Sequence, residues 1–181
     1  MQRYVAFLRA VNLGSRRRVT SADLQSSFEE QGFDDVACFR TSGNVVFTAT
    51  RGEVDEITKR AEEGLCGSLG FEVPVFLRSD HQVRAIADRE PFDVGLVEAS
   101  KGKLQVSFLA AKPPAATSRK ALALATENDL LAISGRELYW LPSGGTQQSA
   151  LDQGALTDLL GPATIRTKGT VERIVAKFFA D

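Results

Sequence analysis

Residues 4–11 are apolar on both alternating faces of an extended chain, apart from one arginine, and this pattern is typical of a strand in the middle of a sheet. Farther along, Thr20 and Asp23 have the spacing of a capping box, which predicts the start of a helix. Gly32 supplies the left-handed residue that ends such a helix. The pattern therefore predicts a central strand and then a helix over residues 21–31.

A β-hairpin is predicted over residues 35–49, because the Ser-Gly-Asn sequence at 42–44 accepts the positive φ angles of a tight turn. After the hairpin, Thr50 and Glu53 form a second capping-box spacing, and apolar residues recur at helical intervals until Gly70. The chain thus continues with two short strands and a second amphipathic helix.

A strand over residues 71–79 completes the first half, and Pro74 favours a position at the sheet edge. The segments 31–40 and 69–78 resemble each other: each runs from a helix end through Gly-Phe and an acidic residue into a strand that ends in arginine. This internal repeat within a βαββαβ order is typical of the ferredoxin-like split βαβ arrangement.

The second half repeats the order more loosely. We expect a strand over 104–110, a helix near 117–126, a hairpin over 130–142, and two helices over about 149–160 and 169–179. The chain is therefore expected to be an α+β protein with two ferredoxin-like halves, each an antiparallel sheet with helices packed on one face. The predicted boundaries are residues 1–79 for the first half, 80–103 for a connecting helix and loop, and 104–181 for a second, βαββα-type half.

The composition is that of an ordinary globular protein, with 181 residues of which 43% are hydrophobic and 25% charged. The 22 Lys and Arg residues balance 23 Asp and Glu residues, so any basic site must be local. The first residues lack the apolar run and cleavage site of a signal peptide, and no segment approaches a membrane span. Cys38 and Cys66 lack a paired-cysteine motif, which favours reduced thiols. We therefore expect a cytoplasmic protein.

In the predicted topology, the loop after the first strand and the turn of the first hairpin lie at the same end of the sheet. Glycine N–H groups, the start of the helix near Thr20 and several guanidinium groups gather there, and each of these attracts an anion. Arg51 and Arg78 belong to the opposite end. We call the first end the basic rim, and its predicted ligand-binding residues are Arg9, Asn12, Gly14, Arg16, Arg17, Arg18, Arg40, Ser42, Gly43 and Asn44.

The same residues have a simpler interpretation. Three consecutive arginines in an exposed loop are usually solvated, and residues 42–44 are first of all a turn. A single Gly-x-Arg loop also lacks the specificity of a full phosphate-binding fingerprint. The residues alone leave both interpretations of the basic rim open.

Signatures of an enzyme are sparse. His81, the one histidine of the sequence, lies between Ser79 and Gln82, which have capping-box spacing, so it is predicted to be a helix-start residue. No catalytic triad, zinc-protease or P-loop motif is present, and we expect no metal and no cofactor. Tyr139 and Trp140 point to opposite faces of one predicted strand, which favours one buried and one exposed ring; stacking of the exposed ring on a ligand is a lesser alternative.

Five segments of the chain occur in the same order as the motifs of a known protein family: "FLRAVNLGSRRRV", "RTSGNVVF", the Pro91-Phe92 pair, "VSFLAAKP" and "TIRTKGTVERI". Through them nearly the whole chain resembles the family catalogued as domain of unknown function 1697. The resemblance implies a duplicated α+β fold with ferredoxin-like halves, and it implies no established activity, cofactor or substrate. It adds Arg166 and Thr170 to the candidate ligand-binding residues. The family pattern has other residues at Ala10, Ser15, Thr41 and Thr167.

From these residues we expect a protein that binds a small anionic ligand, with a phosphate or carboxylate group, at the basic rim. Two alternatives stay open: a nucleic-acid-associated module, and a protein-interaction module that pairs through an open sheet face. An enzyme would need a hydroxyl from Ser42, Thr167 or Thr170 and a carboxylate base such as Asp23 or Glu172. No membrane partner is expected, and both a monomer and a homodimer fit the sequence.

Overall fold

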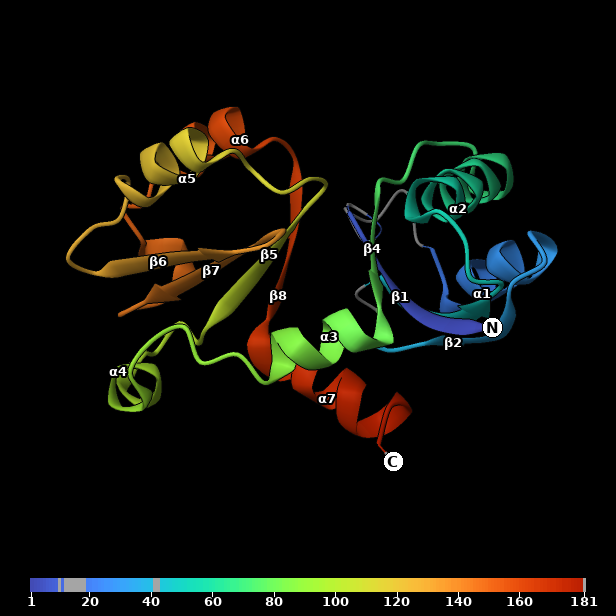
Figure 1. Ribbon diagram of the computed structural model, residues 1–181, viewed down its shortest axis with the longest axis horizontal. Coiled ribbons are helices and arrows are strands. Elements are labelled where there is room, and N and C mark those ends of the chain that lie inside the picture. Colours follow the sequence, from blue (N-terminus) through green and yellow to red (C-terminus); the bar gives the residue numbers. More distant parts are fainter. Residues whose placement is uncertain (10, 12–18, 41–42, 181) are drawn as a thin grey trace. The chain divides into compact units, whose positions relative to one another are not determined.

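The structure, a computed structural model, describes residues 1–9, 11, 19–40 and 43–180 (Figure 1). The chain divides into two compact units, Met1–Arg84 together with Ile174–Asp181, and Ala85–Arg173. Each unit contains a four-stranded antiparallel sheet with helices, which confirms the α+β fold with two similar halves. Within the described residues, every helix is too short or too polar to cross a membrane.

The first unit has the predicted βαββαβ order, and its sheet order is β2-β3-β1-β4. Because β3 pairs antiparallel with both β1 and β2, those two strands run parallel to each other with β3 between them. Strand β1 is therefore central, and β4, which follows Pro74, lies at a sheet edge as predicted. The elements are β1 (Gln2–Leu8), α1 (Ser21–Glu30), β2 (Asp34–Cys38), β3 (Asn44–Ala49), α2 (Val54–Leu69) and β4 (Val75–Ser79).

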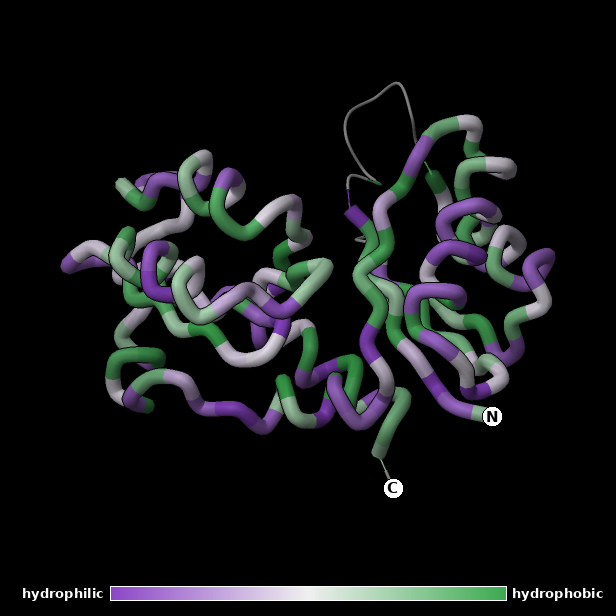
Figure 2. The backbone as a smooth tube through the Cα atoms, turned by 45° about the horizontal axis from the view of Figure 1, so that its top comes forward, coloured by the Kyte–Doolittle hydropathy of each residue, from purple (hydrophilic) through white to green (hydrophobic). Residues whose placement is uncertain are grey.

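Helices α1 and α2 cover one face of this sheet and bury the core of the unit (Figure 1). Thr20 caps α1 through the predicted capping box with Asp23, and Gly70 ends α2 in the left-handed region at φ 74°. In the core, the rings of Phe28 and Phe47 meet with their centroids 5.1 Å apart. Helix α2 alternates between hydrophobic and hydrophilic residues along its length, so one side is buried and the other stays in water (Figure 2).

The second unit repeats this strand order as β6-β7-β5-β8. Its elements are α4 (Val94–Ala99), β5 (Gln105–Leu109), α5 (Ala115–Leu122), β6 (Asp129–Ser134), β7 (Glu137–Pro142), the short 3-10 helix η1 (Thr146–Gln148), α6 (Gln153–Leu160) and β8 (Ala163–Thr167). Helices α3 (Asp80–Ala87) and α7 (Lys168–Phe178) each supply residues to both units. The sequence pattern does not predict β8, because five residues at a sheet edge give too short a pattern, yet β8 completes a second βαββαβ order.

A buried carboxylate ties the β6–β7 hairpin to the segment before α6. Asp129 accepts hydrogen bonds from Trp140 Nε1 at 2.8 Å, from Ser149 Oγ at 2.6 Å and from Thr126 Oγ1 at 2.9 Å. Burial by itself raises the pKa of Asp129, but these three hydrogen bonds outweigh burial and lower the pKa below its usual value. The carboxylate therefore stays charged, and its role is to hold the second unit together.

The prediction of an exposed aromatic ring on β7 is wrong. Tyr139 is 1% exposed and Trp140 is 5% exposed, although the two side chains point to opposite faces of the strand. Trp140 packs in the core under α5 and α6, and Tyr139 is covered as well. Neither ring is therefore open for stacking on a ligand.

Several element boundaries also differ from the sequence pattern, and three of them have a visible cause or consequence. Strand β1 ends at Leu8, short of the predicted residue 11. Helix α2 starts after Glu53, whose side chain makes no capping hydrogen bond, so the predicted Thr50 capping box does not form. Helix α6 begins at Gln153 with Asp152 as its cap, later than the predicted residue 149, and the Ser149 hydroxyl is bound to Asp129.

Candidate functional site

The described residues of the basic rim, Arg9, Arg40, Gly43 and Asn44, lie where four strand ends of the first unit come together: the ends of β1 and β2 and the beginnings of β3 and β4. Leu8 N–H donates to Gly43 O at 2.8 Å, and Arg9 N–H donates to Pro74 O at 3.0 Å. Arg9 thus leaves β1 between the starts of its two neighbouring strands, with its side chain exposed. Backbone pairing therefore fixes the position of this arginine.

The turn between β2 and β3 is closed by two hydrogen bonds across its base. Phe39 N–H donates to Asn44 O at 2.8 Å, and Asn44 Nδ2 donates to Phe39 O at 3.1 Å. Gly43 has a φ of 67°, and a Cβ atom there would lie 3.1 Å from Leu8 Cβ. Both the positive φ and this close approach to the end of β1 favour glycine. Asn44 is fully buried and braces the turn, whereas Arg40 is exposed.

Two exposed cations lie beside the Phe39 ring at this end of the sheet. Arg40 Cζ is 5.7 Å and Lys177 Nζ is 5.9 Å from the ring centroid. Lys177 belongs to the last turn of α7, where the Phe178 ring meets Phe39 edge to face at 6.1 Å. Sequence reasoning missed Lys177, because no local pattern indicates that a residue so far along the chain returns to this turn.

The beginning of α1 lies at the same end of the sheet, since Cys38 Sγ, at the end of β2, donates to Ser21 O at 3.4 Å. Asp23 already occupies this helix start, because its carboxylate accepts from Thr20 N–H and from the Thr20 hydroxyl, each at 2.8 Å. The Thr20 backbone N–H lowers the pKa of Asp23, and burial raises the pKa of the Cys38 thiol. Asp23 therefore acts as a cap, and Cys38 is a protonated thiol at neutral pH.

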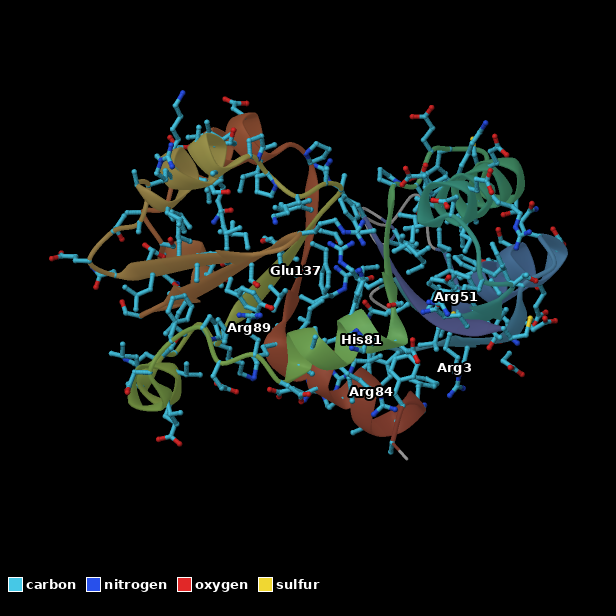
Figure 3. All side chains as sticks on the ribbon, in the orientation of Figure 1. Arg3, Arg51, His81, Arg84, Arg89 and Glu137 are labelled. Atoms are coloured by element: carbon cyan, nitrogen blue, oxygen red, sulfur yellow. The ribbon has the colours of Figure 1, made fainter. Side chains whose placement is uncertain are left out.

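Six of the predicted ligand-binding residues lie outside the described residues, and their roles stay predictions: Asn12, Gly14, Arg16, Arg17, Arg18 and Ser42. The described residues that border the arginine-containing segment are Val11, which is buried, and Val19, which packs against the core of the first unit. Arg51 follows β3 at the opposite end of the sheet, where Gln2 pairs with Ala49 (Figure 3). Arg51 is therefore far from the rim along the strand direction.

An acidic hollow of about 360 Å³ borders the rim on the side of β4. It is lined by Glu62, Glu63, Cys66, Glu72, Val73 and Pro74. Glu62 Oε1 accepts the N–H of Val75 at 2.9 Å, which ties α2 to the beginning of β4. Carboxylates on this side repel an anion, so an anion at the rim is favoured on the side of β2 and β3.

His81 has the structural role that its position predicts. Ser79 N–H donates to Gln82 Oε1 at 3.0 Å, and Gln82 N–H donates to Ser79 Oγ at 3.3 Å, so a complete capping box starts α3. His81 lies exposed in the first turn of this helix (Figure 3). In the part of the chain that the structure describes, no group of three or more His, Cys, Asp or Glu side chains could hold a metal ion.

Arg166 and Thr170 lie in the second unit, at the junction of β8 and α7. Thr167 Oγ1 accepts from Thr170 N–H at 3.2 Å, and the two hydroxyls lie 2.9 Å apart, so this pair caps α7. Arg166 Nη1 donates to Thr164 Oγ1 at 2.9 Å. Burial lowers the pKa of Arg166 to about 10, which leaves the guanidinium charged at neutral pH. That these residues share one site with the basic rim stays a prediction.

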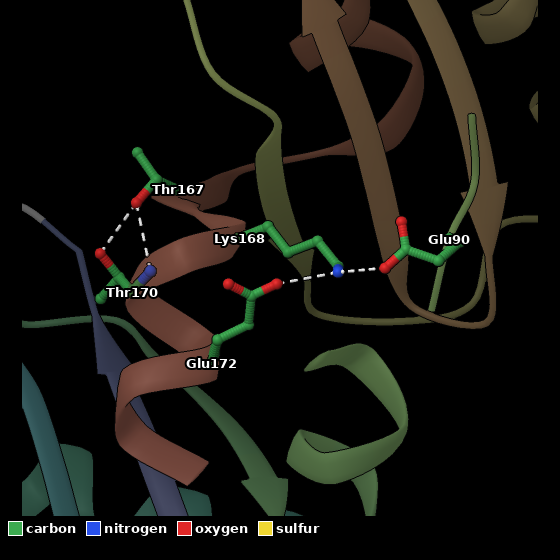
Figure 4. Close-up of polar contacts among 5 residues, drawn as sticks. All are labelled: Glu90, Thr167, Lys168, Thr170 and Glu172. Carbon is green, nitrogen blue, oxygen red and sulfur yellow. Dashed lines mark hydrogen bonds and ion pairs between the residues drawn. The ribbon is translucent and has the colours of Figure 1, made fainter. Parts of the chain in front are cut away.

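Lys168, the first residue of α7, is buried and bound by two carboxylates (Figure 4). Its Nζ lies 2.8 Å from Glu90 Oε1 and 2.9 Å from Glu172 Oε1. Burial by itself lowers the pKa of Lys168, but the hydrogen bonds to the two glutamates outweigh burial and raise it above its ordinary value of 10.5. Lys168 is thus a fixed ammonium group, and Glu172, a predicted candidate base, is committed to an ion pair. Sequence reasoning missed this cluster, although the Lys168–Glu172 spacing is that of a helical ion pair.

The two units together define a duplicated α+β protein, in which exposed Arg9 and Arg40 lie at one end of the first sheet. The chain belongs to the family described as "Protein of unknown function (DUF1697)", whose family model matches residues 1–139. It is similar to the solved structure of the conserved bacterial protein SP0830 from Streptococcus pneumoniae, with a TM-score of 0.72, 16% identity and coverage of 99% of each chain. No curated protein matches the sequence. The match of residues 1–139 includes the whole rim sequence and ends before Arg166.

Replacing Gly43 by valine should destabilise the fold by at least about 1 kcal/mol, because a β-branched residue is strained at positive φ and its Cβ would crowd Leu8. Chemical denaturation measures the change. Gly32→Val is the matched control, since Gly32 also has positive φ, at 73°, but nothing lies within 4 Å of its Cβ position. Gly43→Val should cost more than Gly32→Val. Equal midpoints for Gly43→Val and the parent protein would contradict the structure of the turn.

Replacing Lys168 by methionine should destabilise the protein by about 1 to 2 kcal/mol at neutral pH, since two half-exposed carboxylates lose their partner. Because folding raises the pKa of Lys168, its contribution is present below the ordinary value of 10.5 and is lost as the pH rises through the folded-state pKa. The variant should therefore lose part of the alkaline decline in stability. Lys59→Met removes an exposed pair with the same spacing to Glu63 and should change stability by less than about 0.5 kcal/mol. Equal effects of the two variants would contradict the assigned role of Lys168.

Proposed function

We propose that the chain binds a small anionic ligand, one that carries a phosphate or carboxylate group, at the basic rim. The observation that carries this proposal is the position of two exposed arginines at the same end of one sheet: Arg9 directly follows β1, and Arg40 comes after Phe39, just beyond the end of β2. Guanidinium groups bind oxyanions through two parallel hydrogen bonds. Strand pairing fixes the Arg9 backbone, and the hydrogen bonds between Phe39 and Asn44 fix the residue next to Arg40, so ligand binding has to order mainly the two side chains.

Further positive charge at the same end of the sheet supports the proposal of an anion site. Lys177 lies beside the Phe39 ring with Arg40, and the segment that contains Arg16, Arg17 and Arg18 joins two residues packed in this unit. The whole chain has a formal net charge of −1, so this local excess of cations is not a general property of the protein. A ligand with two or more negative charges would gain most from it.

A small ligand is favoured over a nucleic acid at this site. Phe39 is the aromatic residue beside Arg40, and it is only 9% exposed, so its face is not available for stacking on a base. The acidic hollow on the β4 side also repels a long phosphate backbone that would extend past Pro74. A compact mononucleotide, sugar phosphate or dicarboxylate fits these constraints better.

Binding is favoured over catalysis, because the nearby groups that could react are already engaged. The Asp23 carboxylate caps α1, and the thiol of Cys38 is half-buried with a raised pKa. Neither group is a general base or a nucleophile in this state. We therefore assign the rim to ligand binding and assign no reaction to it.

A thermal-shift panel tests this proposal, with inorganic phosphate, mononucleotides, sugar phosphates, dicarboxylates and short oligonucleotides. A ligand at one hundred times its Kd should stabilise the fold by about 2.7 kcal/mol, which corresponds to a rise in Tm of about 5 to 10 °C for a chain of this size. At least one small anion should give such a shift, and added salt should weaken it. A larger and steeply salt-dependent effect of oligonucleotides would instead favour the nucleic-acid alternative.

Variants locate the binding that the panel finds. Arg9→Ala and Arg40→Ala together should abolish the shift while leaving the ligand-free Tm nearly unchanged, since exposed arginines contribute little to stability. The triple replacement of Arg16, Arg17 and Arg18 by alanine should weaken it as well. Arg51→Ala is the matched control at the opposite end of the sheet and should leave the shift intact. A panel without any shift, or a shift that survives the double replacement, would contradict the proposal.

A further inference from the structure

A cavity of about 420 Å³ lies within the second unit, beside the junction of β8 and α7. Its walls come from α4, from the segment before β5 and from the first turn of α7. The volume is in the range of small-molecule sites, which is about 300 to 1,000 Å³. The residues that line it all belong to the second unit, so an inference about this cavity does not depend on the function proposed for the rim.

Two groups at the wall of this cavity have a donor hydrogen that no hydrogen bond among the described residues uses. The Lys168 ammonium has three hydrogens, and its two partners are Glu90 and Glu172, so one hydrogen is left over. In the first turn of α7, Lys168 N–H donates to Leu104 O and Thr170 N–H donates to Thr167 Oγ1, whereas Gly169 N–H has no such partner. Both groups can therefore donate a further hydrogen bond to a ligand that brings an acceptor oxygen.

The charges around the cavity determine which acceptor fits. The lining contains three carboxylates, Glu90, Glu98 and Glu172, and three cations, Lys103, Lys168 and Arg173. The formal charges cancel, so a multiply charged anion such as phosphate is disfavoured by the glutamates. Glu90 and Glu172 are committed to Lys168, but Glu98 on α4 forms no ion pair among the described residues. The cavity thus has hydrogen-bond donors that suit a carboxylate of a ligand, and the Glu98 carboxylate that suits a cationic group of a ligand.

We infer that this cavity binds a small zwitterion that carries both a carboxylate and an ammonium group, such as a free amino acid. The ligand's carboxylate accepts from Gly169 N–H and Lys168 Nζ at the start of α7, with Arg173 and Lys103 nearby. Its ammonium group pairs with Glu98. An apolar side chain on the ligand packs against Val97 and Leu104, which supply the apolar part of the lining.

Leucine and two compounds that each lack one of its charged groups test this inference on the full chain. Isocaproate lacks the ammonium group, and isopentylamine lacks the carboxylate. The backbone amide resonance of Gly169 is followed by NMR, because this N–H is one of the two proposed donors. Leucine should shift that resonance saturably, and each partial analogue should bind at least about tenfold more weakly. Inorganic phosphate should leave the resonance unchanged.

Two substitutions separate the two halves of the proposed ligand. Glu98→Gln should weaken leucine binding and leave the weak binding of isocaproate unchanged, since only leucine has the ammonium group. Arg173→Gln should weaken the binding of both compounds that carry a carboxylate, leucine and isocaproate. Lys59→Gln, on an exposed face of α2 in the other unit, is the control and should have no effect. The inference is overturned if leucine does not move the Gly169 resonance, if isocaproate binds as tightly as leucine, or if phosphate binds there instead.

Discussion

Strand β3 lies between β1 and β2 and pairs antiparallel with both, and the candidate site of the first unit depends on this one constraint. The pairing puts the ends of β1 and β2 at the same end of the sheet, with Arg9 after one and Arg40 after the other. It also draws Gly43 so close to Leu8 that a side chain at position 43 would crowd Leu8. The glycine, the buried Asn44 amide and the two arginines are therefore consequences of one strand order rather than separate features.

The two units share this construction down to single hydrogen bonds. Leu109 N–H donates to Arg136 O at 2.9 Å at the end of β5, as Leu8 N–H donates to Gly43 O at 2.8 Å at the end of β1. Gly135 turns the second hairpin with a positive φ, as Gly43 does in the first. The two units differ in the side chains around the sheet. The first has exposed cations beside a hairpin, and the second has a cavity next to a fixed ammonium group.

Local signals in the sequence were sufficient to predict most helices and strands, because caps and turns depend on residues that are close in sequence. The capping box at Thr20 and the left-handed stop at Gly70 form as predicted. Contacts between distant segments gave no such signal: Lys177 reaches Phe39 from the far end of the chain, and Lys168 binds a glutamate that precedes β5. The burial of Tyr139 likewise depends on what covers the second face of its sheet, which alternation along a strand does not encode.

The basic rim is proposed to hold an anion through Arg9 and Arg40, and the side-chain Nε–Hε resonances of these two arginines test that proposal most directly. In a titration with inorganic phosphate at low ionic strength, both resonances should shift along one saturation curve, because both guanidinium groups contact the same anion. The Arg51 resonance should stay in place, since Arg51 lies at the opposite end of the sheet. If Arg51 shifts as much as Arg9 and Arg40, or if neither of these two shifts, the rim is a solvated surface and the account is wrong.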